Sequence, residues 1–445
     1  MEAVNPTPFP AQAFEAIDQY EQQFHVFVLR QTFDFSSGKL EYADKQQPLC
    51  DEDEYFGKDQ AGSPRQESDY CPYKPMCDVI VNATAYSPSG KAVPKFPVGL
   101  IVTRDGKQLI EKTLLISGER FFRKRFAVAR LIQWCVKWGT LSLVRLNPWK
   151  LTSPALFTSL PLRAEYSYGG ECRVEQDERA ARRVPAKYRL SKEQLAAHPD
   201  ARDVDKKPPV AHVAFDANAA GIGFATDWYL KATRRARVPA PRIEDPSAKF
   251  TEKQFWRTQK SGNRNATKLD AAGFGIRSKL HPGRRSLIGE LDSAYMNSSA
   301  PLPLGFDFGF WNAAPPDQQT IFLTGGDVVD LINLCPPHTL HMVRNARGHQ
   351  FLSLVLPERA CFIKIDGDGQ DICIPLSIDT VLIEPEAHAL TLVWRLALPK
   401  DDFDGIDSCE FCTADSSERN RARYSDKRSQ THGNSHAGQD RAGAV

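Results

Sequence analysis

Residues 98–116 read V-G-L-I-V-T-R-D-G-K-Q-L-I-E-K-T-L-L-I, and this segment contains a strong signal for β structure. Two aliphatic runs, residues 98–102 and 108–116, flank the dipeptide Asp105-Gly106. Asp-Gly accepts the positive φ angles of a two-residue turn, so it is a strong local signal for a β-hairpin. The stretch therefore predicts two antiparallel strands in a protein built from β-sheets.

Strand-like segments continue on both sides of this hairpin. On its N-terminal side they cover residues 24–29, 32–35 and 78–86. On its C-terminal side they cover residues 320–323, 339–343, 351–356, 361–365, 372–374 and 390–396. The 31 prolines and 28 glycines among 445 residues fit short strands and turns better than long helices. We predict a mainly β fold of antiparallel, sandwich-like sheets with long irregular connections and few short helices.

The chain divides into four predicted parts. They are a lead-in (1–20), an N-terminal antiparallel β unit (21–160), a second β-rich unit (161–400) and a disordered tail (401–445). The tail is predicted because it contains too few apolar residues to offset the entropy of ordering. Within the second unit, residues 171–270 are highly charged and poor in apolar runs, so we interpret them as long connections over a sheet surface. They contain one helix signal, Ser191 followed by Gln194, in the spacing of a capping box.

The composition excludes several classes of partner. Lys and Arg number 57 and Asp and Glu 55, a net charge of +2, so no concentrated basic surface is expected for nucleic acid or an anionic membrane. The most apolar helix-length window, residues 126–143, contains Arg130 and Lys137 and is too short to span a bilayer. The N-terminus lacks the basic and apolar regions of a secretory signal. We expect a cytoplasmic protein whose ten cysteines are reduced.

The common motifs of enzymes and cofactors are missing from the sequence. There is no Gly-Lys-Ser/Thr phosphate loop, no His-Glu-x-x-His and no Gly-x-Ser-x-Gly. Gly221 and Gly223 begin like a dinucleotide loop, but the third glycine is absent and a turn is favoured. We expect no catalytic residues and no cofactor.

The pair Cys409 and Cys412 has the spacing of zinc ligands. A tetrahedral site needs two more ligands, and the nearest candidates, His432 and His436, lie in the predicted tail. Two unpaired thiols in a flexible segment are the simpler interpretation, and metal binding there is left open.

Two further groups resemble metal ligands, and in each a plainer interpretation is favoured. Cys335, His338 and His341 recur every three residues, but a Pro-Pro pair interrupts any helix that would align them. The aspartates within residues 366–371 lack the distal glutamate of a calcium loop and fit a turn between two strands. We expect no metal site in either place.

Residues 120–126 read R-F-F-R-K-R-F, a basic cluster interleaved with aromatic residues. This pattern is compatible with nucleic acid binding. Strand alternation would place the phenylalanines on both faces, however, and a solvated strand edge is the favoured interpretation.

Several unusual short sequence motifs, which we call words, occur in order along the chain. The first is D-Y-C-P-Y-K-P-M-C-D-V-I-V at residues 69–81. The others are Gly118-Glu119-Arg120, Pro161-Leu162-Arg163, Tyr168-Gly169-Gly170, Asn218-x-x-Gly221-x-Gly223-Phe224, Ala272-Gly273-Phe274-Gly275, Pro301-Leu302-Pro303, F-W-N-A-A-P-P-D-Q-Q at 310–319, Asp379-Thr380-Val381 and Val393-Trp394-Arg395. This ordered series, over about residues 20–397, resembles the domain-of-unknown-function family 2169, which is found with bacterial type VI secretion systems.

The resemblance implies a non-enzymatic adaptor or chaperone in the bacterial cytoplasm. It would bind a toxic effector, or the PAAR-type spike-tip protein that carries the effector, and help to load it onto the VgrG spike. The alternative is an effector or hydrolase that acts on its own, with a site built from Asp and His residues that the sequence does not place. A third possibility is a structural component of the spike.

Two of the words supply candidate partner-binding residues. They are Tyr168, Gly169, Gly170, Trp311, Asn312, Asp317, Gln318 and Gln319. Paired glycines allow positive φ or the close approach of another chain, and amide side chains form adaptable hydrogen bonds. The plainer alternatives are a β-bulge or crossover at the glycines, and amides that satisfy buried backbone groups beside a proline-containing loop. We expect Trp394 and Arg395 to make their contacts inside the fold.

Overall fold

The computed structural model describes residues 2–57, 62–125, 147–203, 205–261, 269–291, 301–367, 370–403 and 408–415. Within these ranges the chain is mainly β, and most strand pairs are antiparallel, which confirms the predicted fold class. No helix in these ranges has the length and apolarity needed to cross a membrane. The apolar window at residues 126–143 lies outside them.

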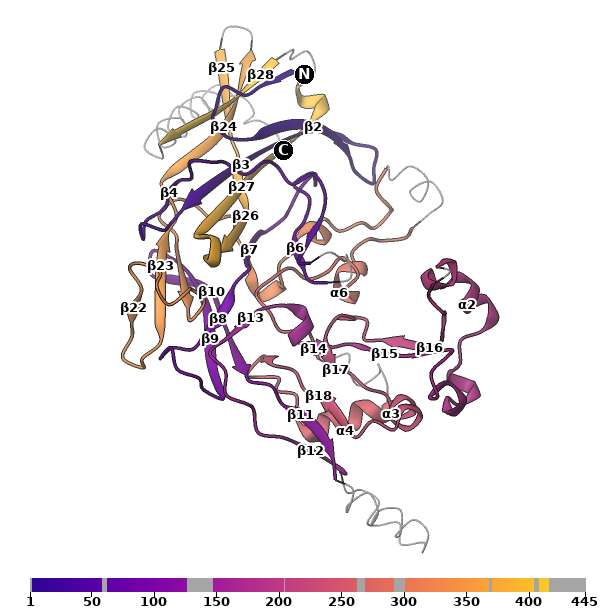
Figure 1. Ribbon diagram of the computed structural model, residues 1–445. Coiled ribbons are helices and arrows are strands. Elements are labelled where there is room, and N and C mark those ends of the chain that lie inside the picture. Colours follow the sequence, from indigo (N-terminus) through magenta and orange to yellow (C-terminus); the bar gives the residue numbers. More distant parts are fainter. Residues whose placement is uncertain are drawn as a thin grey trace, which may run out of the picture.

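The elements run through the chain as follows (Figure 1). The strands are β1 (Glu2–Val4), β2 (Ala11–Ile17), β3 (Gln23–Asp34), β4 (Glu41–Tyr42), β5 (Glu54–Tyr55), β6 (Pro64–Gln66), β7 (Cys77–Val81), β8 (Thr84–Tyr86), β9 (Lys95–Arg104), β10 (Lys107–Ser117), β11 (Phe121–Lys124), β12 (Trp149–Leu151), β13 (Ser159–Pro161), β14 (Tyr168–Gly169), β15 (Glu171–Glu175), β16 (Pro209–Ala214), β17 (Ile222–Gly223), β18 (Arg237–Pro239), β19 (Ile243–Glu244), β20 (Gln319–Thr320), β21 (Val328–Ile332), β22 (Val343–Arg344), β23 (Gln350–Val355), β24 (Arg359–Gly367), β25 (Gln370–Pro375), β26 (Ser377–Glu384), β27 (Ala389–Pro399) and β28 (Ser408–Asp415). The α-helices are α2 (Lys192–Ala197), α3 (Asp227–Thr233), α4 (Glu252–Ser261) and α6 (Pro282–Arg285). Short 3-10 helices include η5 (Pro199–Arg202), η6 (Phe308–Trp311), η7 (Pro316–Gln318) and η9 (Lys400–Phe403).

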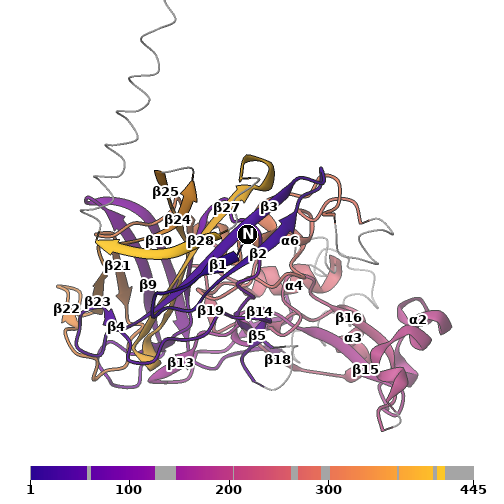
Figure 2. The same cartoon turned by 90° about the horizontal axis from the view of Figure 1, so that it is seen from above.

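Three sheets enclose the main hydrophobic core (Figures 1 and 2). The first has the order β2-β3-β27-β26-β7-β20, with β4 paired to β3. The second has the order β19-β10-β9-β21-β23-β22, and the third β1-β28-β24-β25. One cluster of buried side chains contains Phe27 of the first sheet, Leu100 of the second and Phe411 of the third. The sheets therefore share one core, as expected of a sandwich.

The two strongest local signals in the sequence are confirmed. β9 and β10 form the predicted hairpin, and its two turn residues, Asp105 and Gly106, have φ angles of 48° and 74°. α2 begins with the predicted capping box: the hydroxyl of Ser191 accepts from the backbone N–H of Gln194 at 3.2 Å, and the Gln194 side chain accepts from the Ser191 N–H at 2.9 Å. Both features depend on residues close in sequence.

The interpretation of residues 171–270 as connections over a sheet is wrong. Their strands and helices surround a second hydrophobic core, which we call the aromatic core. Its buried members include Phe122, Trp149, Tyr168, Phe215, Phe224, Trp228, Phe250 and Phe255. The rings come from many short elements, and each is separated from the next by charged residues, so no apolar run marks the core in the sequence. Figure 1 places these elements together, away from β24 and β25.

The predicted disordered tail is wrong for residues 408–415, which form β28. This strand lies between β1 and β24, and its Cys409 and Phe411 are buried. A strand inserted between two others gains backbone hydrogen bonds on both edges, so a few apolar side chains suffice to hold it. The predicted lead-in likewise contributes β1 and β2 to sheets. Residues 416–445 lie outside the described residues.

Other strand predictions were incomplete. β21 and β26 were missed, and of the predicted strand at 339–343 only Val343 belongs to a strand, β22. The predicted division near residue 160 does not separate the sheets, because the first two sheets take strands from both sides of it. The turn predicted at 366–369 joins β24 and β25, which pair as an antiparallel ladder, but residues 368 and 369 lie outside the described part of the chain.

The cysteines provide a test of the core. Burial raises the pKa of the Cys335 thiol to about 12, with a smaller effect from the charge of Glu386, whereas Cys373 is exposed on β25. Because the thiolate is the reactive form, we expect iodoacetamide to modify Cys373 about tenfold or more faster than Cys335 in the native protein. Peptide mapping by mass spectrometry measures both rates. Equal rates without denaturant would contradict the placement of Cys335.

Candidate functional site

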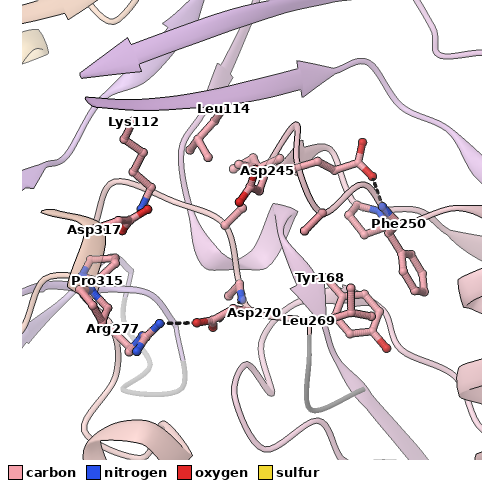
Figure 3. Close-up of a pocket in the computed structure, with 17 residues that line it drawn as sticks. Lys112, Leu114, Tyr168, Asp245, Phe250, Leu269, Asp270, Arg277, Pro315 and Asp317 are labelled. Atoms are coloured by element: carbon pink, nitrogen blue, oxygen red, sulfur yellow. Dashed lines mark hydrogen bonds and ion pairs between the residues drawn. The ribbon is translucent and has the colours of Figure 1, made fainter. Parts of the chain in front are cut away.

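A hollow of about 350 Å³ lies where the aromatic core meets β10 of the second sheet (Figure 3). We call it the junction pocket. Its lining residues are Lys112, Leu114, Tyr168, Pro241, Ile243, Glu244, Asp245, Ala248, Phe250, Leu269, Asp270, Ala271, Ala272, Arg277, Pro315, Pro316 and Asp317. Tyr168 and Asp317 come from the two words that the sequence singled out, and the fold brings them to the same pocket.

One side of the pocket contains a buried lysine. Alternation along β10 turns Lys112 inward, and its Nζ donates to Asp317 Oδ1 at 2.8 Å and to Gln318 Oε1 at 2.7 Å. Burial lowers the pKa of Lys112, and the negative charge of Asp317 opposes this effect only in part. Asp317 itself is more than half exposed, so the pair joins the interior to the rim of the pocket.

Another part of the lining contains Asp270 and Arg277, which form a network with His281, a residue outside the lining. Arg277 forms an ion pair with the Asp270 carboxylate, and His281 Nε2 lies 3.0 Å from Asp270 Oδ1. His281 Nδ1 accepts from the backbone N–H of Gly283 at 3.0 Å, so Nε2 carries the proton and donates to Asp270. Both ring nitrogens are engaged, and the imidazole has no free lone pair with which to activate a nucleophile.

The remaining acidic side chains of the pocket also have partners. Glu244 is buried, forms an ion pair with Arg120 and accepts from the backbone N–H of Phe250 at 3.0 Å. Asp245 accepts from the backbone and hydroxyl groups of Ser247, each at 2.7 Å. The pocket therefore combines apolar walls with charged groups that the protein itself already satisfies.

The Asp270 network makes stability depend on pH in the acidic range. Burial raises the pKa of Asp270, but the hydrogen bond from His281 and the charge of Arg277 outweigh it, and the net pKa lies below its ordinary value of 3.8. A lowered carboxyl pKa stabilises the fold above the unfolded value, and this contribution is lost as pH falls through the folded value. We expect Asp270→Asn to lower the free energy of unfolding at neutral pH by a small amount, because the carboxylate is nearly half exposed.

Denaturant titrations of the wild type and of Asp270→Asn over a series of pH values measure this difference. It should begin to shrink below about pH 4, where the carboxyl of the unfolded chain becomes protonated, and it should vanish once the pH falls below the lowered pKa of the folded protein. A difference that grows on acidification would contradict the assignment.

The paired glycines are explained by contacts within the chain. β14 pairs in parallel with β17, which places Gly169 and Gly170 against the loop that begins at Asn218. A Cβ atom at Gly169 would lie 2.1 Å from the Asn218 carbonyl oxygen, and one at Gly170 would lie 2.6 Å from that of Gly221. The close approach predicted for a partner is thus made by the protein's own loop, in agreement with the plainer interpretation.

Most candidates from the F-W-N-A-A-P-P-D-Q-Q word also face inward. Asn312 donates to Met76 O at 2.8 Å, and Gln318 donates to Val79 O and Phe274 O, both at 2.8 Å.

The other two candidates from that word besides Asp317 also make contacts within the protein. Gln319 donates to Ala314 O at 2.7 Å, and Trp311 packs against Phe306 and Phe310. Of the eight candidates, only Tyr168 and Asp317 line the junction pocket. Their role in binding a partner stays a prediction.

Sequence reasoning missed Lys112, Asp270 and Arg277. A signal for Lys112 was present, since it occupies an inward position in the alternating strand 110–116. The word A-G-F-G at residues 272–275 lies beside the pocket but contains none of its charged groups. Asp270 and Arg277 lie just outside that word and have no distinctive pattern of their own.

As far as the structure describes them, the groups with metal-ligand spacing do not converge, and His432 and His436 lie outside the described residues. Cys335 is buried while His338 and His341 are exposed. Cys409 is buried on β28, and Cys412 of the same strand is half-buried. Among the described residues, no group of three or more His, Cys, Asp or Glu side chains is placed to hold a metal ion.

The predicted internal role of Trp394 and Arg395 is confirmed. Trp394 Nε1 donates to Gln31 Oε1 at 2.9 Å, and Arg395 Nε donates to Asp379 Oδ2 at 2.5 Å. Arg395 also donates to the carbonyl of Cys71 at 2.7 Å. The words at 69–81, 379–381 and 393–395 therefore meet in a buried polar network.

Comparison with known proteins identifies the family. No curated protein and no solved structure shows significant similarity to the chain. The model of one family, described as an uncharacterized protein conserved in bacteria (DUF2169), matches residues 21–395. This match covers most of the chain. It includes the words that contribute residues to the junction pocket and to the buried polar network. The protein therefore belongs to the DUF2169 family.

Proposed function

We propose that the protein is a non-enzymatic adaptor of a type VI secretion system. It binds an effector, or the PAAR-type spike-tip protein that carries the effector, in the bacterial cytoplasm and helps to load it onto the VgrG spike. The resemblance carried by the words supports this role. The observation that carries the proposal is the junction pocket, a preformed hollow whose charged groups are all satisfied within the protein.

The chemistry of the pocket suits binding better than catalysis. A general base needs a free lone pair within reach of a substrate, whereas His281 has both nitrogens engaged and Glu244 is held by two donors. The walls formed by Leu114, Leu269 and the Pro315-Pro316 pair are apolar. A pocket of this size and polarity can receive one anchoring side chain from a partner, and such buried anchors contribute most of the energy of protein interfaces.

An affinity pull-down tests the function. The tagged protein is isolated from bacteria that express the type VI genes, and the retained proteins are identified by mass spectrometry. We expect an effector or spike-tip protein in near-equal amount. Recovery of neither would contradict the adaptor role. Growth arrest on expression of this chain alone, abolished by His281→Ala or Asp270→Asn, would instead favour the hydrolase alternative.

Filling the pocket is expected to weaken partner binding. Ala248 is exposed and lines the hollow, so Ala248→Trp occupies the hollow without removing a buried group. We expect about a tenfold or greater loss of the retained partner, as for the loss of one interface anchor. Ala92→Trp introduces the same ring at an exposed position outside the pocket and serves as the matched control. Equal retention by both variants would exclude the junction pocket as the contact site.

A further inference from the structure

The small sheet β12-β11-β18 lies beside the other elements of the aromatic core (Figure 1). A row of positively charged residues crosses this sheet. In this sheet Arg123 lies directly opposite Lys150 on one side and directly opposite Arg237 on the other. Residues opposite each other in antiparallel strands point to the same face. The three cations therefore stand in line on one face of the sheet, and Arg125 follows on the same side two residues beyond Arg123.

This face is turned to solvent. The other face is packed into the aromatic core through Phe122 and Val238. Arg123, Lys150 and Arg237 are all exposed, as the alternation of the strands requires. We call the surface formed by Arg123, Arg125, Lys150 and Arg237 the basic face. It borders a hollow of about 450 Å³ lined by residues 123–125 and 150–153.

The basic face is electrostatically unfavourable in the isolated protein. Like charges directly opposite each other in a sheet destabilise it. None of the four cations forms an ion pair with an acidic side chain in the part of the chain that the structure describes. Some arginines elsewhere in the protein do have an acidic partner: Arg104 lies 2.7 Å from Asp327, and Arg65 lies 2.8 Å from Glu384. The row, which has no acidic partner among the described residues, therefore offers attraction to an external anion.

We propose that the basic face binds an acidic, extended segment of a partner polypeptide. The row spans about 10 Å across three strands, which matches a few carboxylates along one extended chain. Arginine side chains bind carboxylates through two parallel hydrogen bonds, so Arg123 and Arg237 are suited to this partner. The inference rests on the proposed function in one respect, namely that the partner is a protein.

The same surface is poorly suited to nucleic acid. Single-stranded nucleic acids bind through bases stacked on open aromatic rings. Phe121, which alternation along β11 places on this face, is already covered by the guanidinium of Arg237, whose central carbon lies 3.3 Å from the ring centroid. The net charge of the whole chain is only +2, which gives no broad positive field for a polyanion.

Fluorescence anisotropy with a labelled octaglutamate peptide tests the proposal on the full-length chain. We expect binding at low ionic strength that weakens as salt is added. Arg123→Glu should weaken binding about tenfold or more, because it places a repulsive carboxylate at the centre of the row. The melting temperature of Arg123→Glu should be equal to or higher than that of the wild type, because the new carboxylate pairs with Lys150 and Arg237. Lys91→Glu, at an exposed position in another loop, is the matched control and should bind as the wild type.

Three results would overturn the assignment. They are no binding of the peptide by the wild type, equal binding by Arg123→Glu, and tighter binding of an oligothymidylate of equal charge. The affinity pull-down distinguishes failure of the basic-face proposal from failure of the adaptor role. A chain that retains an effector or spike protein but does not bind octaglutamate remains an adaptor without an acidic-segment site.

Discussion

Replacement of Asp78 by alanine is expected to lower the free energy of unfolding by about 3–5 kcal/mol. Asp78 is fully buried, and its carboxylate accepts from Lys74 Nζ at 3.0 Å and from Asn312 Nδ2 at 3.1 Å. It also accepts from the backbone N–H groups of Ala313 and Ala314 at 2.8 and 3.2 Å. The substitution would leave a buried ammonium and several buried donors without their acceptor, which is the costly way to break an ion pair.

The charge of Lys74 is the main reason for this magnitude. Burial alone would lower the pKa of Lys74, but the charges of Asp78 and Asp379 outweigh burial, and its pKa is raised. Without Asp78, the lysine loses its direct ionic partner and keeps the hydrogen bond to Thr380 at 2.8 Å and the more distant charge of Asp379. The network connects the word at residues 69–81 to the loop before β20, so its loss should loosen both.

Urea unfolding followed by tryptophan fluorescence measures the effect. Asp177→Ala is the matched control, since it breaks an Asp–Lys pair with Lys207 that is largely exposed and 3.6 Å apart. An exposed pair of this kind contributes about 0–1 kcal/mol. If Asp78→Ala costs no more than this control, the buried network does not hold the fold together as described.

Replacement of Phe411 by alanine is expected to cost about 3–5 kcal/mol as well. The ring is 1% exposed and meets the edge of Phe27 with centroids 6.0 Å apart. The truncation removes apolar surface from the main core and leaves a cavity between the first and third sheets, whose lining loses its contacts. The composition of this part of the chain, by contrast, is that of a solvated tail.

The same unfolding experiment checks this result. Cys412→Ala, a small change at the half-buried neighbouring position on β28, should cost less than about 1 kcal/mol. A comparably small cost for Phe411→Ala would mean that residues 408–415 do not complete the core in solution.

The sequence predicted those parts of the fold that depend on neighbouring residues. Asp105-Gly106 specifies its turn through the φ angles that the two residues accept, and Ser191 specifies a helix start through its own hydroxyl. β26 was missed for the opposite reason. It is parallel to β7 and antiparallel to β27, and Val381, Leu382 and Ile383 are all buried, so no alternation marks the strand.

The candidate site was predictable only in part. Tyr168 and Asp317 were singled out as members of unusual words, but nothing local indicates that they share a pocket. Lys112 and Asp317 are 205 residues apart in sequence, and their contact follows from the way in which η7 packs on β10. Arg123 and Arg125 of the basic face were visible as part of a cluster of charges, whereas Lys150 and Arg237 join them only through the register of β11 with β12 and β18.

The most direct test of the adaptor role is a light-scattering measurement on purified components. The partner recovered by the pull-down is refolded alone and together with this protein, and the molar mass of each species is determined after size-exclusion chromatography. The account predicts a stoichiometric complex with a partner that otherwise aggregates, and loss of that complex with Ala248→Trp but not with Ala92→Trp. A partner that stays soluble alone and elutes separately from this protein would contradict it.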